Sequence, residues 1–118
     1  MPTKTKKKPS KPKPDPVLAC LIDARKRITP KGAWCQGEVA KDKNGAEVGI
    51  DSPRAVAWCM LGATGTHSDA SSSADLMLAQ VVPGNEVTAW NDAPGRTQKE
   101  VLALFDKAIA LRRKEATK

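Results

Sequence analysis

The chain has 118 residues and a formal net charge of +7, and hydrophobic residues make up 40% of it. This length suits one small domain with one modest core. No apolar run approaches the roughly 20 residues that a membrane-spanning helix needs, and no apolar segment typical of a secretory signal follows the charged start. We therefore expect a soluble, cytoplasmic protein with no membrane partner.

The positive charge is concentrated in residues 1–15, which are rich in lysine and proline and contain no large apolar side chain after Met1. This composition predicts a disordered basic arm, followed by one globular domain at residues 16–114 and a short tail at 115–118. Six lysines less Asp15 give the arm +5, whereas the remaining 14 basic and 12 acidic residues give only +2. The lysines that would contact a polyanion are Lys4, Lys6, Lys7, Lys8, Lys11 and Lys13. The arm is typical of a solubilising tail, of a nonspecific nucleic-acid or acidic-partner contact, or of an address that a receptor recognises.

The first predicted helix begins at Asp15-Pro16. Aspartate accepts hydrogen bonds from the free amides of a first helical turn, and proline suits the first helical position. Apolar residues at helical spacing continue to about Thr29, where Pro30 and Gly32 end the helix.

The next two segments, Trp34–Lys41 and Ala46–Ile50, predict a β-hairpin around the sequence Asp42-Lys43-Asn44-Gly45. Two registers are open. An Asn-Gly turn would place Val39 opposite Ile50 and Lys41 opposite Val48, whereas a three-residue loop would place Gly45 at a bulge.

Asp51-Ser52-Pro53 predicts the start of a second helix, whose apolar body runs from Arg54 to Ala63. A polar loop is expected at Thr64–Ser73, and a short third helix at Asp75–Val82. With the final helix, these elements predict an α+β fold, mainly α: a small helical bundle with one β-hairpin, in the order α-β-β-α-α-α.

The final helix has the most specific start. Thr97 and Glu100 have the spacing of a capping box, in which each side chain accepts a hydrogen bond from the other's backbone amide. A core-facing stripe follows, and basic residues near its end complement the helix dipole.

Cysteine usage favours neither a disulfide framework nor a metal site. Cys20, Cys35 and Cys59 are odd in number and form no Cys-x-x-Cys pair, so we expect free thiols in a reducing compartment. The apolar surroundings predicted for Cys59 would raise its pKa, and His67 is expected to be solvated in the polar loop. The sequence therefore predicts no cofactor, no metal and no catalytic residue.

The segment from Trp90 to Thr97 supports two interpretations. It can be an ordinary turn, in which Asn91 and Asp92 bond to their own backbone. Alternatively it is a site for a partner or a small anionic ligand, in which Arg96 and the free amides after Thr97 hold the anion and the two Asx side chains add specificity.

Three tryptophans supply most of the aromatic surface of a chain with one Phe and no Tyr. Core packing is expected for each of them. The alternative is that one of them forms the wall of a ligand or partner pocket, and Trp34 joins the Trp90 segment as a candidate contact.

The motifs Trp58-Cys59-Met60-Leu61-Gly62-Ala63 and Trp90-Asn91-Asp92, together with the leading helix and the Trp34 segment, resemble a family of small bacterial and bacteriophage domains of unknown function. The resemblance covers roughly residues 17–112 and leaves the basic arm outside. The resemblance implies the domain boundaries and a bacterial host cell. It implies no activity, because the family has none established.

The nearly neutral domain and the lack of a catalytic cluster favour a non-enzymatic binding or regulatory module. It would be a phage or prophage accessory protein that acts on a partner protein or a small anionic ligand. The alternative is a nucleic-acid-associated protein whose arm contacts phosphates nonspecifically. The sequence does not decide whether the protein is an enzyme, but the lack of a catalytic cluster disfavours an enzymatic function.

Overall fold

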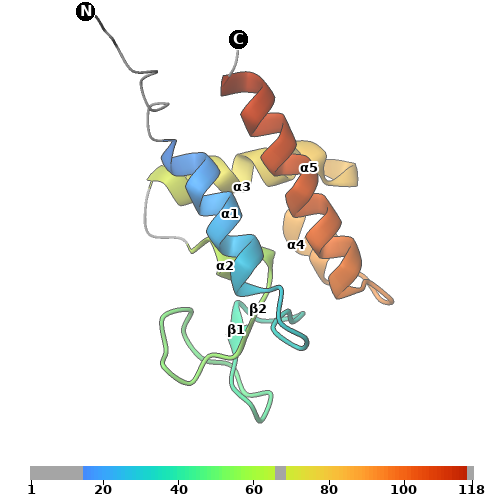
Figure 1. The fold of residues 1–118 in the computed structure, drawn as a ribbon. Coiled ribbons are helices and arrows are strands. Elements are labelled where there is room, and N and C mark those ends of the chain that lie inside the picture. The colour runs from blue at the N-terminus through green and yellow to red at the C-terminus, as the bar shows by residue number, and fades with distance from the viewer. Residues whose placement is uncertain (1–14, 66–68, 117–118) are drawn as a thin grey trace, which may run out of the picture.

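The structure, a computed structural model, describes residues 15–65 and 69–116 and is drawn in Figure 1. It is an α+β fold, mainly α, as predicted. In chain order, the elements are α1 (Pro16–Arg27), β1 (Ala40–Lys41), β2 (Ala57–Trp58), α2 (Met60–Thr64), α3 (Asp69–Val81), the 3-10 turn η1 (Pro83–Asn85), α4 (Val87–Asn91) and α5 (Gln98–Ala116). The predicted arm at residues 1–14 lies outside the described residues and stays a prediction.

The long helices α1, α3 and α5 pack against one another and enclose the core. In Figure 1, α1 and α5 run side by side while α3 crosses behind them. Fully buried side chains fill the space between them, among them Leu21, Leu78 and Phe105. The two strands and the long loops around them lie at the end of the bundle where α1 finishes.

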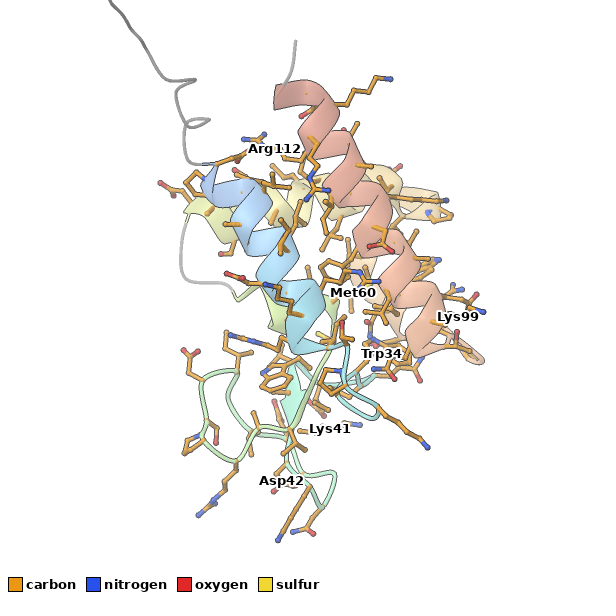
Figure 2. All side chains as sticks on the ribbon, in the orientation of Figure 1. Trp34, Lys41, Asp42, Met60, Lys99 and Arg112 are labelled. Carbon is orange, nitrogen blue, oxygen red and sulfur yellow. The ribbon has the colours of Figure 1, made fainter. Side chains whose placement is uncertain are left out.

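Both predicted helix starts at the ends of the domain are confirmed. The Asp15 carboxylate accepts a hydrogen bond from the Leu18 amide at 3.1 Å, and it also pairs with Arg112 of α5 at 3.0 Å, beside the start of α1 in Figure 2. At the start of α5, the Thr97 amide donates to Glu100 Oε1 at 2.9 Å and the Glu100 amide donates to Thr97 Oγ1 at 3.2 Å. Because such caps depend only on neighbouring residues, sequence alone could place them.

The predicted hairpin is wrong in its second strand, because Ala46–Ile50 forms only an isolated bridge at Glu47 and β1 pairs with β2 instead. Its turn does form, in the three-residue register. Lys41 lies opposite Glu47, the Asp42 amide donates to the Ala46 carbonyl at 2.9 Å, and Gly45 has a φ of 83°. The alternative register, with Lys41 opposite Val48, is wrong. A left-handed backbone at the last loop position closes a three-residue loop, and glycine adopts it without strain.

The predicted second helix over Arg54–Ala63 is wrong in its first half. Ala57–Trp58 forms β2, antiparallel to β1, and the helix begins only at Met60. The backbone of Trp58 is paired on its other side as well, because its amide donates to Ala33 O at 2.9 Å and its carbonyl accepts from the Cys35 amide at 3.0 Å. Pairing with distant segments satisfies these polar groups and overrides the local helical pattern.

Two boundaries in the second half of the chain also differ from the prediction. Helix α3 begins at Asp69, so the expected polar loop over Thr64–Ser73 is helical from that residue, and Ser71 is 2% exposed. The short helix α4 at Val87–Asn91 was not predicted. Residues 66–68, and with them His67, lie outside the described residues. In the described part of the chain, no helix is long and apolar enough to cross a membrane.

Candidate functional site

Asn91, at the end of α4, lies at the centre of a buried hydrogen-bond cluster that we call the Asn91 hub (Trp34, Cys35, Met60, Asn91 and Asp92). The residue as a whole is only 1% exposed. The amide oxygen accepts from Trp34 Nε1 at 2.7 Å and from the Met60 amide at 3.1 Å. The amide nitrogen donates to Cys35 O at 3.2 Å and to Asp92 Oδ1 at 2.9 Å. Asn91 therefore uses its full hydrogen-bonding capacity, and Figure 2 shows Trp34 and Met60 close together near the lower end of α1.

A second group of bonds fastens the loop after Trp34 to the end of α4. Gln36 Nε2 donates to Asn91 O and to Ala93 O, both at 2.9 Å, and Asp92 Oδ1 accepts from the Gly37 amide at 2.9 Å. Together with the hub, these bonds fix three segments that are distant in the sequence: the Trp34–Gly37 loop, the start of α2 and the end of α4.

An open cleft of about 190 Å³ lies beside the hub, between the Gly37–Val39 segment and α4. Its apolar surface comes from Val39, Leu61 and Val87, and Cys59 and Thr88 add a thiol and a hydroxyl. Val39 is 40% exposed, so part of this apolar surface faces solvent.

All the described charged residues that line the cleft are acidic. Glu38, Glu47 and Asp92 line it, and no described lysine or arginine does. None of these three carboxylates forms an ion pair within the described part of the chain. A cleft of this kind favours a ligand that combines an apolar body with a positive charge and disfavours an anion.

The six candidate residues from the sequence fall into two places. Trp34, Asn91 and Asp92 meet in the hub, and the two Asx residues line the cleft. Trp90, Arg96 and Thr97 form a separate cluster at the start of α5.

In that second cluster, the Arg96 guanidinium stacks 3.8 Å from the centre of the Trp90 ring. It also donates to Trp90 O at 2.9 Å and pairs with Glu100 at 3.2 Å. Two of the groups expected to hold an anion are therefore engaged within the chain, because Glu100 balances the charge of Arg96 and the Glu100 amide donates to Thr97.

Sequence reasoning missed most of the cleft lining. Val39, Glu38 and Glu47 were assigned to a hairpin without a binding role, and Thr88 lies on the short helix that was not expected. Cys59 was assigned to an apolar helix, whereas its thiol caps α2 by accepting from the Gly62 amide at 3.3 Å. The sequence features that indicated this place were the Trp-Cys motif around Cys59 and the candidate residues Asn91 and Asp92.

Two titratable groups near the cleft have altered pKa values. Burial, with a smaller contribution from the neighbouring Cys59, raises the pKa of the Cys35 thiol to about 11. Burial also raises the pKa of Cys59. Both side chains are therefore mostly protonated near neutral pH, so any reaction through either thiolate is slow there and faster at higher pH. Among the described residues, no three His, Cys, Asp or Glu side chains converge as metal ligands.

Asp75 of α3 lies away from the cleft. Burial raises its pKa to about 6. It accepts a hydrogen bond of 2.6 Å from Thr64 Oγ1, and the thiol of Cys20 donates to the backbone carbonyl of Thr64 at 3.4 Å. This cluster connects α1, α2 and α3 and influences stability through its protonation.

The fold and the site define a small, mainly helical α+β domain with an open acidic cleft. The chain belongs to a family of unknown function (DUF6197), whose model matches residues 12–111. This range contains the whole Asn91 hub and confirms the expected membership of a family without known activity, although it begins five residues earlier than expected. No curated protein and no solved structure matches the chain.

Proposed function

We propose that the protein is a non-enzymatic binding module, which holds a basic segment of a partner protein in the cleft beside the Asn91 hub. The observation that carries the proposal is the charge of the cleft, whose three carboxylates form no ion pair within the described residues and lie near the exposed side chain of Val39. One of them, Asp92, also accepts hydrogen bonds from the Gly37 amide and from Asn91. A lysine or arginine side chain combines an apolar stem with a charged end and matches this lining. In keeping with the resemblance found in the sequence, we place the module in the cytoplasm of a bacterial host, as a regulatory or phage accessory protein.

The rigidity of the hub supports this function. A binding surface loses less entropy when its walls are already fixed before the ligand arrives. Here both walls are fixed by bonds to one buried residue, because the Trp34–Gly37 loop and the start of α2 are both bonded to Asn91.

Two labelled octapeptides test the proposal. They share the same aliphatic residues, and one carries two lysines where the other carries two glutamates. Fluorescence anisotropy at about 50 mM salt should show binding of the lysine peptide to the full chain, at an affinity at least fivefold above that of the glutamate peptide. Glu47→Gln should weaken it by about two- to fivefold, the range expected for one exposed charge pair. Asp23→Asn, which removes an exposed carboxylate from α1, is the matched control and should have no effect.

Thr88→Trp provides the second variant, because an indole at this exposed lining position would fill the cleft. It should abolish binding of the lysine peptide without lowering the melting temperature by more than a few degrees. Equal affinity for the two peptides, or undiminished binding of the lysine peptide to a folded Thr88→Trp variant, would refute the proposal.

The lysine-rich start of the chain favours a second candidate, which is nonspecific contact with nucleic acid. Its +5 charge, set against +2 for all remaining residues, would attract a polyanion through counterion release. This activity would belong to residues 1–15 and is separable from the cleft by truncation.

A further inference from the structure

Cys35 and Cys59 are neighbours across a parallel bridge. Trp34 and Trp58 pair in parallel orientation, and the Cys35 amide donates to the Trp58 carbonyl at 3.0 Å. The residues that follow the bridge, Cys35 and Cys59, therefore lie side by side. In regular paired strands, which are about 4.8 Å apart, successive side chains alternate between the two faces, and residues that lie side by side share a face. This spacing lies within the roughly 4.4–6.8 Å between Cα atoms that a disulfide requires.

The environments of the two sulfur atoms assign them different roles. Cys59 is half-buried and lines the cleft, whereas Cys35 is buried, with its thiol 3.6 Å from Glu38 O. Both cysteines are free in the structure. An oxidant entering the cleft would reach Cys59 first, and Cys35 would meet the oxidised sulfur from inside the domain.

We propose that Cys35 and Cys59 are a modification site, at which a peroxide forms a reversible disulfide that closes the cleft to its ligand. In the first step, the thiolate of Cys59 attacks one peroxide oxygen and breaks the O–O bond. This yields a sulfenic acid and one hydroxide, which takes up the proton lost from Cys59 and becomes water. The thiolate of Cys35 then attacks this sulfur, the S–O bond breaks, and a second water leaves with the proton from Cys35. Two thiols are oxidised to one disulfide and one peroxide is reduced to two waters.

The effect on the cleft, which rests on the proposed function, follows from the cap of α2. Cys59 Sγ now accepts from the Gly62 amide, and bonding to Cys35 draws the sulfur away from that amide. Leu61, between these residues, lines the cleft, so the first turn of α2 shifts together with the apolar wall. A lost cap costs about 1 kcal/mol of helix stability, which equals about a fivefold change in affinity if it falls wholly on binding. We therefore expect the lysine octapeptide to bind the oxidised protein up to about fivefold more weakly.

Peptide mapping tests the bond in the intact, folded chain. The protein is treated with hydrogen peroxide at pH 8.5, where more of each buried thiol is ionised, then denatured, alkylated and digested. We expect a cross-linked peptide joining Cys35 to Cys59, with Cys20 still alkylated, and full reversal by dithiothreitol. Cys59→Ser should lose the bond, and Cys35→Ser should leave a sulfenic acid that dimedone traps at Cys59. Cys20→Ser, at the third thiol, is the matched control and should behave like the natural chain.

The results separate this inference from the proposed function. Oxidation that gives only overoxidised thiols, cross-linked dimers or a bond to Cys20 would overturn the inference, even if the lysine peptide binds. Equal peptide affinity of the reduced and oxidised forms would overturn the regulation. A Cys35–Cys59 bond in a protein that never binds the peptide would leave the modification site intact and refute the proposed function and the regulation that rests on it.

Discussion

Replacing Asn91 with alanine should destabilise the domain more than any ordinary surface change, because it removes four hydrogen bonds from a side chain that is 1% exposed. Each buried group left without a partner costs about 1–3 kcal/mol. The Met60 amide and Cys35 carbonyl belong to buried residues, whereas Trp34 is only half-buried and its indole can reach water. We therefore expect a loss of about 3–5 kcal/mol, a large part of the roughly 5–15 kcal/mol that stabilises a domain.

A second variant, Asn91→Asp, tests how the buried position responds to a charge. The introduced carboxyl keeps the acceptor for Trp34 and Met60 but loses the donated bonds and places a charge beside Asp92. Burial would raise its pKa above that in the unfolded chain, so the protonated form is favoured on folding. Relative to the natural chain, the variant should therefore lose stability as pH rises through that raised pKa, whereas the Asn91→Ala difference should change little with pH.

Urea unfolding followed by circular dichroism from pH 4 to pH 8 measures both variants. A loss below about 1 kcal/mol for Asn91→Ala would refute the argument, because it would mean that the hub is not needed to satisfy buried polar groups. A pH-independent deficit for Asn91→Asp would contradict the electrostatic part alone.

Three further changes test other parts of the structure. Because burial raises the pKa of Asp75 to about 6, the natural chain should lose stability as pH rises from about 4 through 6. The Asp75→Asn variant keeps an acceptor for Thr64 and should be more stable than the natural chain by about 1–2 kcal/mol above pH 7. This free energy is smaller than the full pKa shift would give, because the side chain is partly solvated. A stability difference between the two proteins that stays constant from pH 4 to pH 8 would disprove this. Gly62→Ala should unfold the domain or lower its stability by more than about 3 kcal/mol, since the new Cβ would overlap the Val39 backbone, whereas Gly49→Ala meets nothing within 4 Å and should melt within a few degrees of the natural chain. Removing residues 1–14 should abolish DNA binding measured by gel shift, and raising salt from about 50 to 200 mM should weaken binding by the full chain steeply; salt-insensitive binding by the truncated protein would contradict an arm-based contact.

The features that the sequence by itself determined are those that depend on neighbouring residues. Asp15 with Leu18, and Thr97 with Glu100, place both partners of a helix cap within four residues. The turn around Gly45 was also predicted, but the sequence left its register open between two alternatives. The apolar stripes of α1 and α5 likewise indicate which face is buried, because helical periodicity is a local property. These elements were sufficient to predict a mainly helical α+β fold.

The tertiary structure alone decided the middle of the chain and the cleft. Trp58 follows a helical pattern in sequence, yet its backbone pairs with Ala40 of β1 and with Ala33, partners 18 or more residues away. The sequence left Asn91 as either a turn residue or a ligand contact, and its role in the hub depends on a tryptophan 57 positions earlier and an amide 31 positions earlier. No local pattern encodes such distances, because hydrogen bonds between remote segments form only when packing brings the segments together. The cleft is therefore a property of the assembled fold.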